Sequence, residues 1–186
     1  HRMKERPIGI LVDALRSLGA QISYEENEGY PPLKIIGKKI AKDKVSLPAN
    51  ISSQYISSLC LIGARLTNGL QIELVGKITS VPYVKMTLSL LEDVGIASIF
   101  SGNTITITPK SEVSPKTLVV ESDWSAASYY YSVVALAEVG TEVELSSFKE
   151  HSLQGDSILS EIYQTFGVVT KYAGNTIVLK KQGDAE

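Results

Sequence analysis

The stretch best suited to chemistry is the hydroxyl-rich segment Ser52-Ser53-Gln54, which lies where a polar cluster gives way to apolar residues. This transition predicts a loop leading into a helix, with Ser52 or Ser53 as the N-cap. A helix start gathers unpaired backbone N–H groups and the positive end of the helix dipole. Two adjacent hydroxyls placed there can therefore hold a phosphate group. The alternative is that these serines only cap the helix.

The helix expected after these serines has one apolar face. Four residues recur at helical spacing and form the expected core face: Tyr55, Leu59, Ile62 and Leu66. The only cysteine, Cys60, lies on the apolar side of the same helix. A single cysteine excludes a disulfide or a cysteine-based metal site within one chain, and it fits a reducing, cytosolic setting.

Composition and charge narrow the classes of partner. With 186 residues, 44% of them hydrophobic, the chain is long enough to bury a sizeable core. The net charge is −2, and the lysines between Lys38 and Lys44 are interrupted by Asp43, as in a solvated loop. We therefore expect neither nucleic acid nor an anionic membrane as a partner. No apolar run reaches membrane-spanning length.

The elements that must position the serines follow from apolar periodicity and from turn residues. The first segment reads as a helix between Pro7 and Gly19, followed by two strands at 21–24 and 33–36. A second block, 44–108, reads as βαβαββ. It contains the serine helix, a strand at 71–75, a helix from Pro82 to Gly95, and a closing hairpin that turns at Gly102-Asn103.

A third block, 117–186, repeats that order. The tetrapeptide Gly102-Asn103-Thr104-Ile105 returns 72 residues later as Gly174-Asn175-Thr176-Ile177, and a one-residue gap aligns Ser52 and Ser53 with Ser125 and Ala126. The segment 1–40 has the pattern of the back half of another copy. The polar, proline-bounded segment 109–116 is a linker or hinge. The sequence thus predicts an α/β (α+β) protein built of repeated modules.

Five motifs, in this order, resemble the 5-enolpyruvylshikimate-3-phosphate (EPSP) synthase family over essentially the whole chain. They are Arg2-Met3-Lys4-Glu5-Arg6-Pro7-Ile8, Ser52-Ser53-Gln54-Tyr55, Ser80-Val81-Pro82-Tyr83, Asp123-Trp124-Ser125-Ala126-Ala127-Ser128-Tyr129 and Ser152-Leu153-Gln154-Gly155-Asp156. The resemblance implies an inside-out barrel of six βαβαββ modules, of which an internal fragment of about two and a half is present here. Residues 1–116 would be the later half of the shikimate-3-phosphate-binding domain, and residues 117–186 the first module of the second domain.

The resemblance also implies roles for individual residues. The proposed ligands of shikimate-3-phosphate are Ser52, Ser53, Gln54, Ser80 and Tyr83. Gln54 would also reach phosphoenolpyruvate, which Arg2 would grip with its planar guanidinium.

Three further positions bear on the site with less weight: Asp123, the segment Ser152–Asp156, and Val81. Asp123 is a candidate site residue whose alternative role is a helix N-cap. The segment Ser152–Asp156 reads as scaffold. Val81 stands where the family usually has a basic residue, which removes a positive charge from the rim of the phosphate site.

The family reaction moves the enolpyruvyl group of phosphoenolpyruvate to the 5-hydroxyl of shikimate-3-phosphate and releases phosphate, in chorismate and aromatic amino-acid biosynthesis. It needs no metal or organic cofactor. The acid–base residues of the family have no counterpart in this chain, so we expect the fragment alone to be inactive. Its partners would be the two substrates and the remaining modules of the same enzyme, without nucleic acid or membrane.

Two alternatives stay open. The related enolpyruvyl transferase acting on UDP-N-acetylglucosamine shares the six-module architecture, but its reactive cysteine loop has no counterpart here, because Cys60 lies in an apolar helix. The other alternative is a repeat scaffold or nucleic-acid-binding module whose serines are only caps. The lack of a basic or aromatic binding surface in the sequence argues against it.

Overall fold

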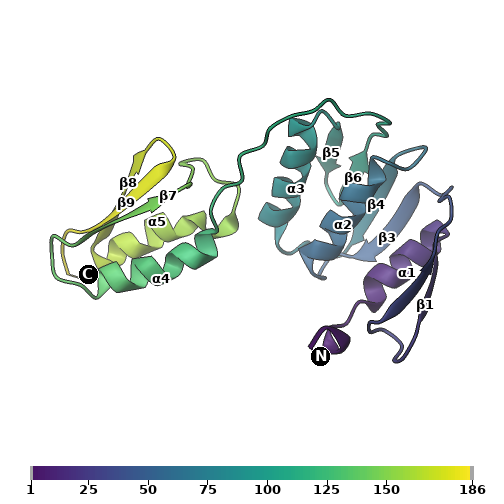
Figure 1. Ribbon diagram of the computed structural model, residues 1–186, viewed down its shortest axis with the longest axis horizontal. Helices are drawn as coiled ribbons and strands as arrows, with labels where there is room; N and C mark the ends of the chain where they lie inside the picture. The colour runs from purple at the N-terminus through teal and green to yellow at the C-terminus, as the bar shows by residue number, and fades with distance from the viewer. Residues whose placement is uncertain (1, 185–186) are drawn as a thin grey trace. The chain divides into compact units, whose positions relative to one another are not determined.

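The chain separates into two compact units in the computed structural model, which describes residues 2–184. Unit 1 is His1–Pro115 and unit 2 is Lys116–Glu186. Each unit has its own hydrophobic core. Figure 1 shows the helices and strands of each unit. Which substrate each unit serves remains a prediction.

Unit 1 opens with a helix and a hairpin. A 3₁₀ turn, η1 (Arg2–Glu5), precedes α1 (Gly9–Leu18), which ends at Gly19 in the left-handed conformation, φ 109°. The antiparallel strands β1 (Gln21–Tyr24) and β2 (Leu33–Ile36) follow, with the predicted bounds.

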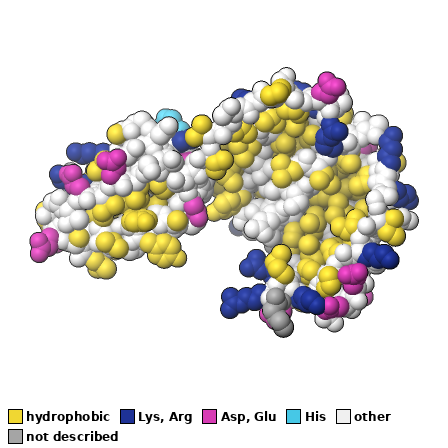
Figure 2. Space-filling view, in the orientation of Figure 1, with side chains coloured by type: hydrophobic (Ala, Val, Ile, Leu, Met, Phe, Trp, Pro, Cys, Tyr) yellow, Lys and Arg dark blue, Asp and Glu magenta, His cyan; other side chains and the backbone are white. Residues whose placement is uncertain are grey.

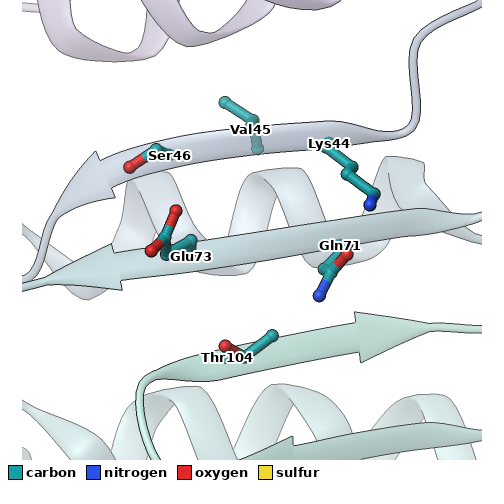
Figure 3. Close-up of a pocket in the computed structure, with 6 residues that line it drawn as sticks. All are labelled: Lys44, Val45, Ser46, Gln71, Glu73 and Thr104. Carbon is teal, nitrogen blue, oxygen red and sulfur yellow. The ribbon is translucent and has the colours of Figure 1, made fainter.

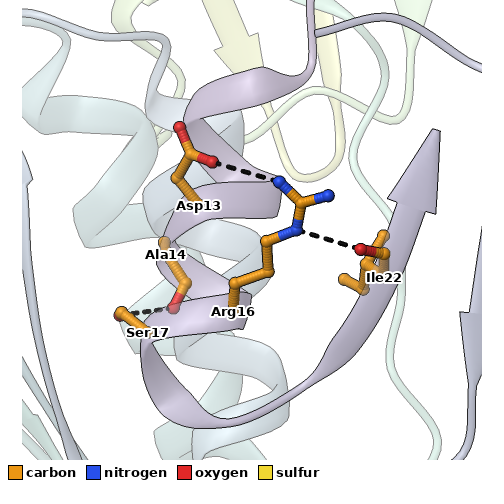
Figure 4. Close-up of polar contacts among 5 residues, drawn as sticks. All are labelled: Asp13, Ala14, Arg16, Ser17 and Ile22. Atoms are coloured by element: carbon orange, nitrogen blue, oxygen red, sulfur yellow. Dashed lines mark hydrogen bonds and ion pairs between the residues drawn. The ribbon is translucent and has the colours of Figure 1, made fainter. Parts of the chain in front are cut away.

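Arg16 holds α1 against this hairpin. Its Nε donates a hydrogen bond of 2.9 Å to the carbonyl oxygen of Ile22 (Figure 4). Its guanidinium lies 5.0 Å from the centre of the Tyr24 ring. An ion pair with Asp13, 3.8 Å between Nη1 and Oδ1, orients the same side chain. Arg16 therefore fixes the angle at which α1 meets β1.

The rest of unit 1 is a complete βαβαββ module. Its sheet has the order β3-β4-β6-β5, in which β3 (Lys44–Pro48) and β4 (Leu70–Val75) are parallel and the remaining pairs are antiparallel. The strands β5 (Ser98–Ser101) and β6 (Thr104–Ile107) form the predicted hairpin around Gly102-Asn103. The helices α2 (Ser53–Gly63) and α3 (Val81–Asp93) pack against each other and bury the apolar face of the sheet.

The predicted core face of α2 was wrong in part. The buried residues are Ile56, Leu59, Cys60 and Gly63, whereas Ile62 is 36% exposed. The helix ends at Gly63, so Leu66 lies beyond it. The reason is close packing at Gly63, where a Cβ would lie 2.9 Å from the Cβ of Leu70 and 3.2 Å from that of Ile107. A side chain there would push the helix off the sheet, so the glycine faces the strands.

Unit 2 contains one long helix over a three-stranded antiparallel sheet. The helix is α4 (Trp124–Ala135), and the sheet order is β7-β9-β8, from β7 (Glu142–Ser146), β8 (Val168–Ala173) and β9 (Thr176–Lys181). Between β7 and β8 lie η2 (Gly155–Ile158), α5 (Leu159–Ile162) and η3 (Tyr163–Phe166). The core is built on Trp124, which packs edge-on against Phe148 with ring centres 5.1 Å apart.

The expected first strand of the second full module does not form. Residues 117–121 have no strand partner, and Val119 and Val120 are 70% and 85% exposed. In unit 1, the first strand buries Val45 and Leu47 in the core that also contains α1. Within the described part of unit 2 no helix corresponds to α1, so an apolar strand at this position would lack its cover.

Gly63→Ala tests the close packing of α2 on its sheet. We expect the free energy of unfolding of unit 1 to fall by about 1–2 kcal/mol, because overpacking outweighs the small gain in helix propensity. Urea denaturation followed by circular dichroism measures it. Gly37→Ala is the control, since a Cβ there meets nothing within 4 Å. Equal stability of the two variants would show that α2 can move away at no cost.

Candidate functional site

The starts of α2 and α3 lie at one edge of the unit 1 sheet. Because β3 and β4 are parallel, their carboxyl ends point the same way, and each leads into one of the two helices. Ala49 joins the two connecting loops. Its N–H donates to the carbonyl of Val75 at 2.8 Å, and its carbonyl accepts from the N–H of Thr79 at 3.4 Å. The segments that carry the predicted phosphate ligands are therefore neighbours.

Ser52 caps α2. Its hydroxyl oxygen accepts a hydrogen bond from the N–H of Gln54 at 3.3 Å. A hydroxyl that accepts this bond still has its own proton to donate, so capping and anion binding are compatible. Ser52 and Gln54 are exposed and Ser53 is half-buried. The first turn of α2 thus presents accessible hydroxyl and amide groups beside unpaired N–H groups.

Ser80 stands at the start of α3 in a strained conformation. Its backbone is left-handed, φ 56° and ψ 35°, and its side chain makes no capping hydrogen bond to the helix. Ser80 is exposed, and Tyr83, one turn later, is 37% exposed. The hydroxyl of Ser57 lies 2.7 Å from that of Thr87, which links α2 to α3 one turn further along. This link holds the two helix starts in register.

The segment that follows Arg2 is attached to α2. The hydroxyl of Tyr55 donates to the carbonyl of Pro7 at 2.5 Å, and the N–H of Ile8 donates to the carbonyl of Gly29 at 2.8 Å. Lys4 and Glu26 form an ion pair that ties η1 to the loop after β1. Arg2 is exposed. The structure therefore brings Pro7, five positions after Arg2, to the first turn of α2 and leaves the Arg2 side chain exposed.

Asp123 lies in unit 2 and caps α4. Its Oδ1 accepts from the N–H of Ser125 at 2.8 Å, which is the capping role weighed from the sequence. The carboxylate is exposed. A role toward substrate remains a prediction.

The helix registers correct the predicted alignment of the two modules. The buried residues Ala127, Tyr131 and Val134 of α4 each lie 71 positions after a buried residue of α2, namely Ile56, Cys60 and Gly63. Ser52 and Ser53 thus correspond to Asp123 and Trp124, and the predicted match to Ser125 and Ala126 was wrong. Unit 2 keeps the helix, but the position that corresponds to Ser53 is occupied by Trp124, a fully buried core residue.

The Ser152–Asp156 segment serves the scaffold, as predicted. Gln154 accepts from the N–H of Trp124 at 3.0 Å and donates to the carbonyl of Ser122 at 2.8 Å. The sequence reasoning missed Glu121, whose Oε1 accepts from the indole N–H of Trp124 and whose Oε2 accepts from the hydroxyl of Ser152, both at 2.9 Å. The bonds of Gln154 and Ser152 join residues about 30 positions apart and hold the loops together at the start of α4.

The face of the unit 1 sheet that points away from α2 and α3 has a shallow, solvent-exposed depression. Its lining residues are Lys44, Val45, Ser46, Gln71, Glu73 and Thr104 (Figure 3). The polar members occupy alternate positions of their strands, facing away from the buried residues, as expected for a sheet with one wet side. This face carries no convergent set of buried polar groups.

Other kinds of site find little support within residues 2–184. In that range no three His, Cys, Asp or Glu side chains gather as a metal would require. Nor does any described helix have the length and apolarity to cross a bilayer. On the face seen in Figure 2, Lys and Arg side chains are interspersed with carboxylates rather than gathered into one basic surface.

Comparison with known proteins decides the family. The family model described as EPSP synthase (3-phosphoshikimate 1-carboxyvinyltransferase) matches residues 1–185. The chain belongs to the EPSP synthase family.

Curated relatives with the name 3-phosphoshikimate 1-carboxyvinyltransferase agree. Two from Bacteroides fragilis strains are 48% and 45% identical over 184 and 182 residues, and one from Vibrio cholerae is 38% identical over 186 residues. Each match covers 98% of this chain but only 43–44% of the relative, so the chain spans less than half the length of the curated relatives it matches.

A solved structure shares the fold. EPSP synthase from Acinetobacter baumannii superimposes with a TM-score of 0.72 at 22% identity, covering 97% of this chain and 41% of that one. At this identity the likeness supports the α/β fold and no more.

Cys60 gives a test of how tightly α2 is packed. Burial raises the pKa of its thiol to about 12, so the reactive thiolate is scarce at pH 8. We expect Ellman's reagent to label the native chain at least 100-fold more slowly than the urea-unfolded chain, because reaction requires opening of the core. Labelling of the native chain at the rate of the unfolded chain would mean that Cys60 is exposed as a reactive loop cysteine would be.

Proposed function

We propose that this chain forms part of an enzyme that transfers the enolpyruvyl group of phosphoenolpyruvate to the 5-hydroxyl of shikimate-3-phosphate and releases phosphate. The observation that carries the proposal is the meeting of two helix starts, bearing Ser52, Ser53 and Ser80, at one sheet edge in a member of the EPSP synthase family. The pathway would be the synthesis of chorismate and the aromatic amino acids.

The hydroxyls are suited to the phosphate of shikimate-3-phosphate. Ser52, Ser53 and Ser80 supply O–H donors, and the starts of α2 and α3 add backbone N–H groups and favourable dipoles. Ser80 makes no capping bond to α3, so its hydroxyl can donate to a ligand. Tyr83, partly exposed one turn further, can line the ring of the same substrate.

Gln54 and Arg2 are suited to the space between the two substrates. The Gln54 amide has both donors and an acceptor, so it can contact the ring hydroxyls and phosphoenolpyruvate together. Arg2, permanently charged and planar, can bind a carboxylate or phosphate through two parallel hydrogen bonds. Holding two anions side by side requires such a cation, because their repulsion otherwise opposes binding.

The chemistry itself needs groups that this chain is not proposed to supply. A base takes the proton of the 5-hydroxyl as its oxygen attacks the enol carbon, and an acid protonates the methylene carbon, giving a tetrahedral intermediate. Loss of phosphate and of a methyl proton then restores the double bond. Neither acid nor base is assigned to a residue here, so this chain would bind and position the substrate without completing the reaction.

The alternatives receive less support from the structure. A UDP-N-acetylglucosamine enolpyruvyl transferase would need a reactive cysteine, whereas Cys60 is fully buried in α2. A nucleic-acid-binding module would need a basic surface, which the face in Figure 2 does not present.

Replacement of the two serines tests the phosphate site. We expect Ser52→Ala combined with Ser53→Ala to weaken shikimate-3-phosphate binding by about 1–3 kcal/mol, through loss of hydroxyl donors. Isothermal titration calorimetry measures it. Arg2→Ala should leave this binary binding nearly unchanged, because its proposed partner is phosphoenolpyruvate. The control is Ser23→Ala with Ser46→Ala, two exposed strand serines away from the helix starts. Equal weakening by the control pair would contradict the assignment.

Ser52→Asp separates anion binding from capping. Aspartate caps helices as well as serine does, and Asp123 caps α4 in this chain. We expect the melting temperature to be kept, while shikimate-3-phosphate binding is lost because the carboxylate repels the phosphate. If the variant keeps both its stability and its affinity, Ser52 is only a cap.

A kinetic measurement addresses the missing chemistry. The purified chain should release no phosphate from phosphoenolpyruvate in the presence of shikimate-3-phosphate, because the proposed site lacks an acid and a base. A coupled phosphate assay, with full-length enzyme excluded by mass spectrometry, checks this. Turnover that depends on shikimate-3-phosphate would show that the chain carries catalytic groups of its own.

A further inference from the structure

The loop between β4 and α3 is short, and hydrogen bonds hold both of its ends. Ala49 binds the carbonyl of Val75 at one end and the N–H of Thr79 at the other. The side-chain amide of Asn103 donates to the carbonyl of Gly76 at 2.8 Å, and Gly76 turns the chain at φ 100°. Ile78 packs against the hydrophobic core of unit 1. These contacts fix the loop on both sides of Lys77, which follows Gly76 and is exposed.

Lys77 is exposed to solvent. Within residues 2–184 it makes no ion pair or hydrogen bond through its side chain. Ser80 is three positions after Lys77, so their Cα atoms are at most about 11 Å apart. The flexible four-carbon stem of lysine can cover much of that distance. Ala49, which anchors the loop, is itself three residues before Ser52.

The proposed phosphate site otherwise lacks a cation at the start of α3. Its donors are hydroxyls and helix N–H groups, and the first residue of α3, Val81, is apolar. A phosphate monoester carries close to two negative charges at neutral pH, which neutral donors only partly offset. A mobile ammonium group beside Ser80 would supply the missing charge.

We propose that Lys77 is a ligand of the phosphate group of shikimate-3-phosphate, closing over it from the loop that precedes α3. This inference rests on the proposed function of the same site. Because the ammonium group is exposed to solvent, its attraction for the phosphate weakens as ionic strength rises. The same attraction favours the phosphorylated substrate over shikimate.

Calorimetric binding of shikimate-3-phosphate and of unphosphorylated shikimate to this chain tests the inference. Lys77→Gln should raise the dissociation constant for shikimate-3-phosphate about tenfold at low ionic strength, and the difference should shrink as salt is added. Binding of shikimate should not change. Lys44→Gln, the same charge change on the far side of the sheet, is the matched control. Adding Val81→Lys to Lys77→Gln should restore affinity to within about threefold, since it returns a cation next to Ser80.

The outcomes separate the two claims. If the chain binds shikimate-3-phosphate and Lys77→Gln changes its affinity no more than Lys44→Gln does, Lys77 is not a ligand, and the proposed function is untouched. Equal weakening of shikimate and shikimate-3-phosphate would show a structural effect of the loop, which also overturns the inference. If the unmodified chain binds neither compound, the proposed function of the site fails, and the role of Lys77 fails with it.

Discussion

The parallel pairing of β3 with β4 is the constraint on which the candidate site depends. In a parallel pair both strands end at the same edge, so the helices that follow them start side by side. The register runs from Lys44 opposite Gln71 to Pro48 opposite Val75. Beyond the strands, Ala49 in the first loop forms hydrogen bonds with Val75 and with Thr79 in the second loop. An antiparallel pairing of the same strands would send the two helix starts to opposite ends and leave no shared anion site.

The two modules show how one architecture can keep or lose such a site. In unit 1 the first turn of α2 presents Ser52, Ser53 and Gln54 to solvent. At the matching turn of α4, Trp124 is buried against Phe148 and its backbone and indole N–H groups bind Gln154 and Glu121. Polar groups that could meet a ligand in unit 1 are thus satisfied within the protein in unit 2.

Much of the local structure could be predicted because its cause is local. The bounds of β1 and β2, the turn at Gly102-Asn103, the helix start at Ser52 and the left-handed stop at Gly19 all follow from residue types at short spacing. The core face of α2 could not, because periodicity counts large apolar residues, whereas Gly63 faces the sheet for lack of a side chain. The unformed strand at 117–121 and the hydrogen bonds from Lys149 and Ser152 to Glu121 depend on partners distant in sequence, which spacing does not reveal. The roles of the site residues came from family resemblance, and the structure adds that the loops before α2 and α3 are hydrogen-bonded neighbours.

Amide NMR spectra of this chain, titrated with shikimate-3-phosphate and in parallel with shikimate, test the shared anion site most directly. A phosphate held between the starts of α2 and α3 should shift the N–H signals of Ser53, Gln54, Val81 and Tyr83 together, with one common dissociation constant, and shikimate should shift them far less. Phosphate-dependent shifts confined to one of the two helix starts, or centred on Trp124 and Ser125 at the start of α4, would contradict a site built from both helices of unit 1.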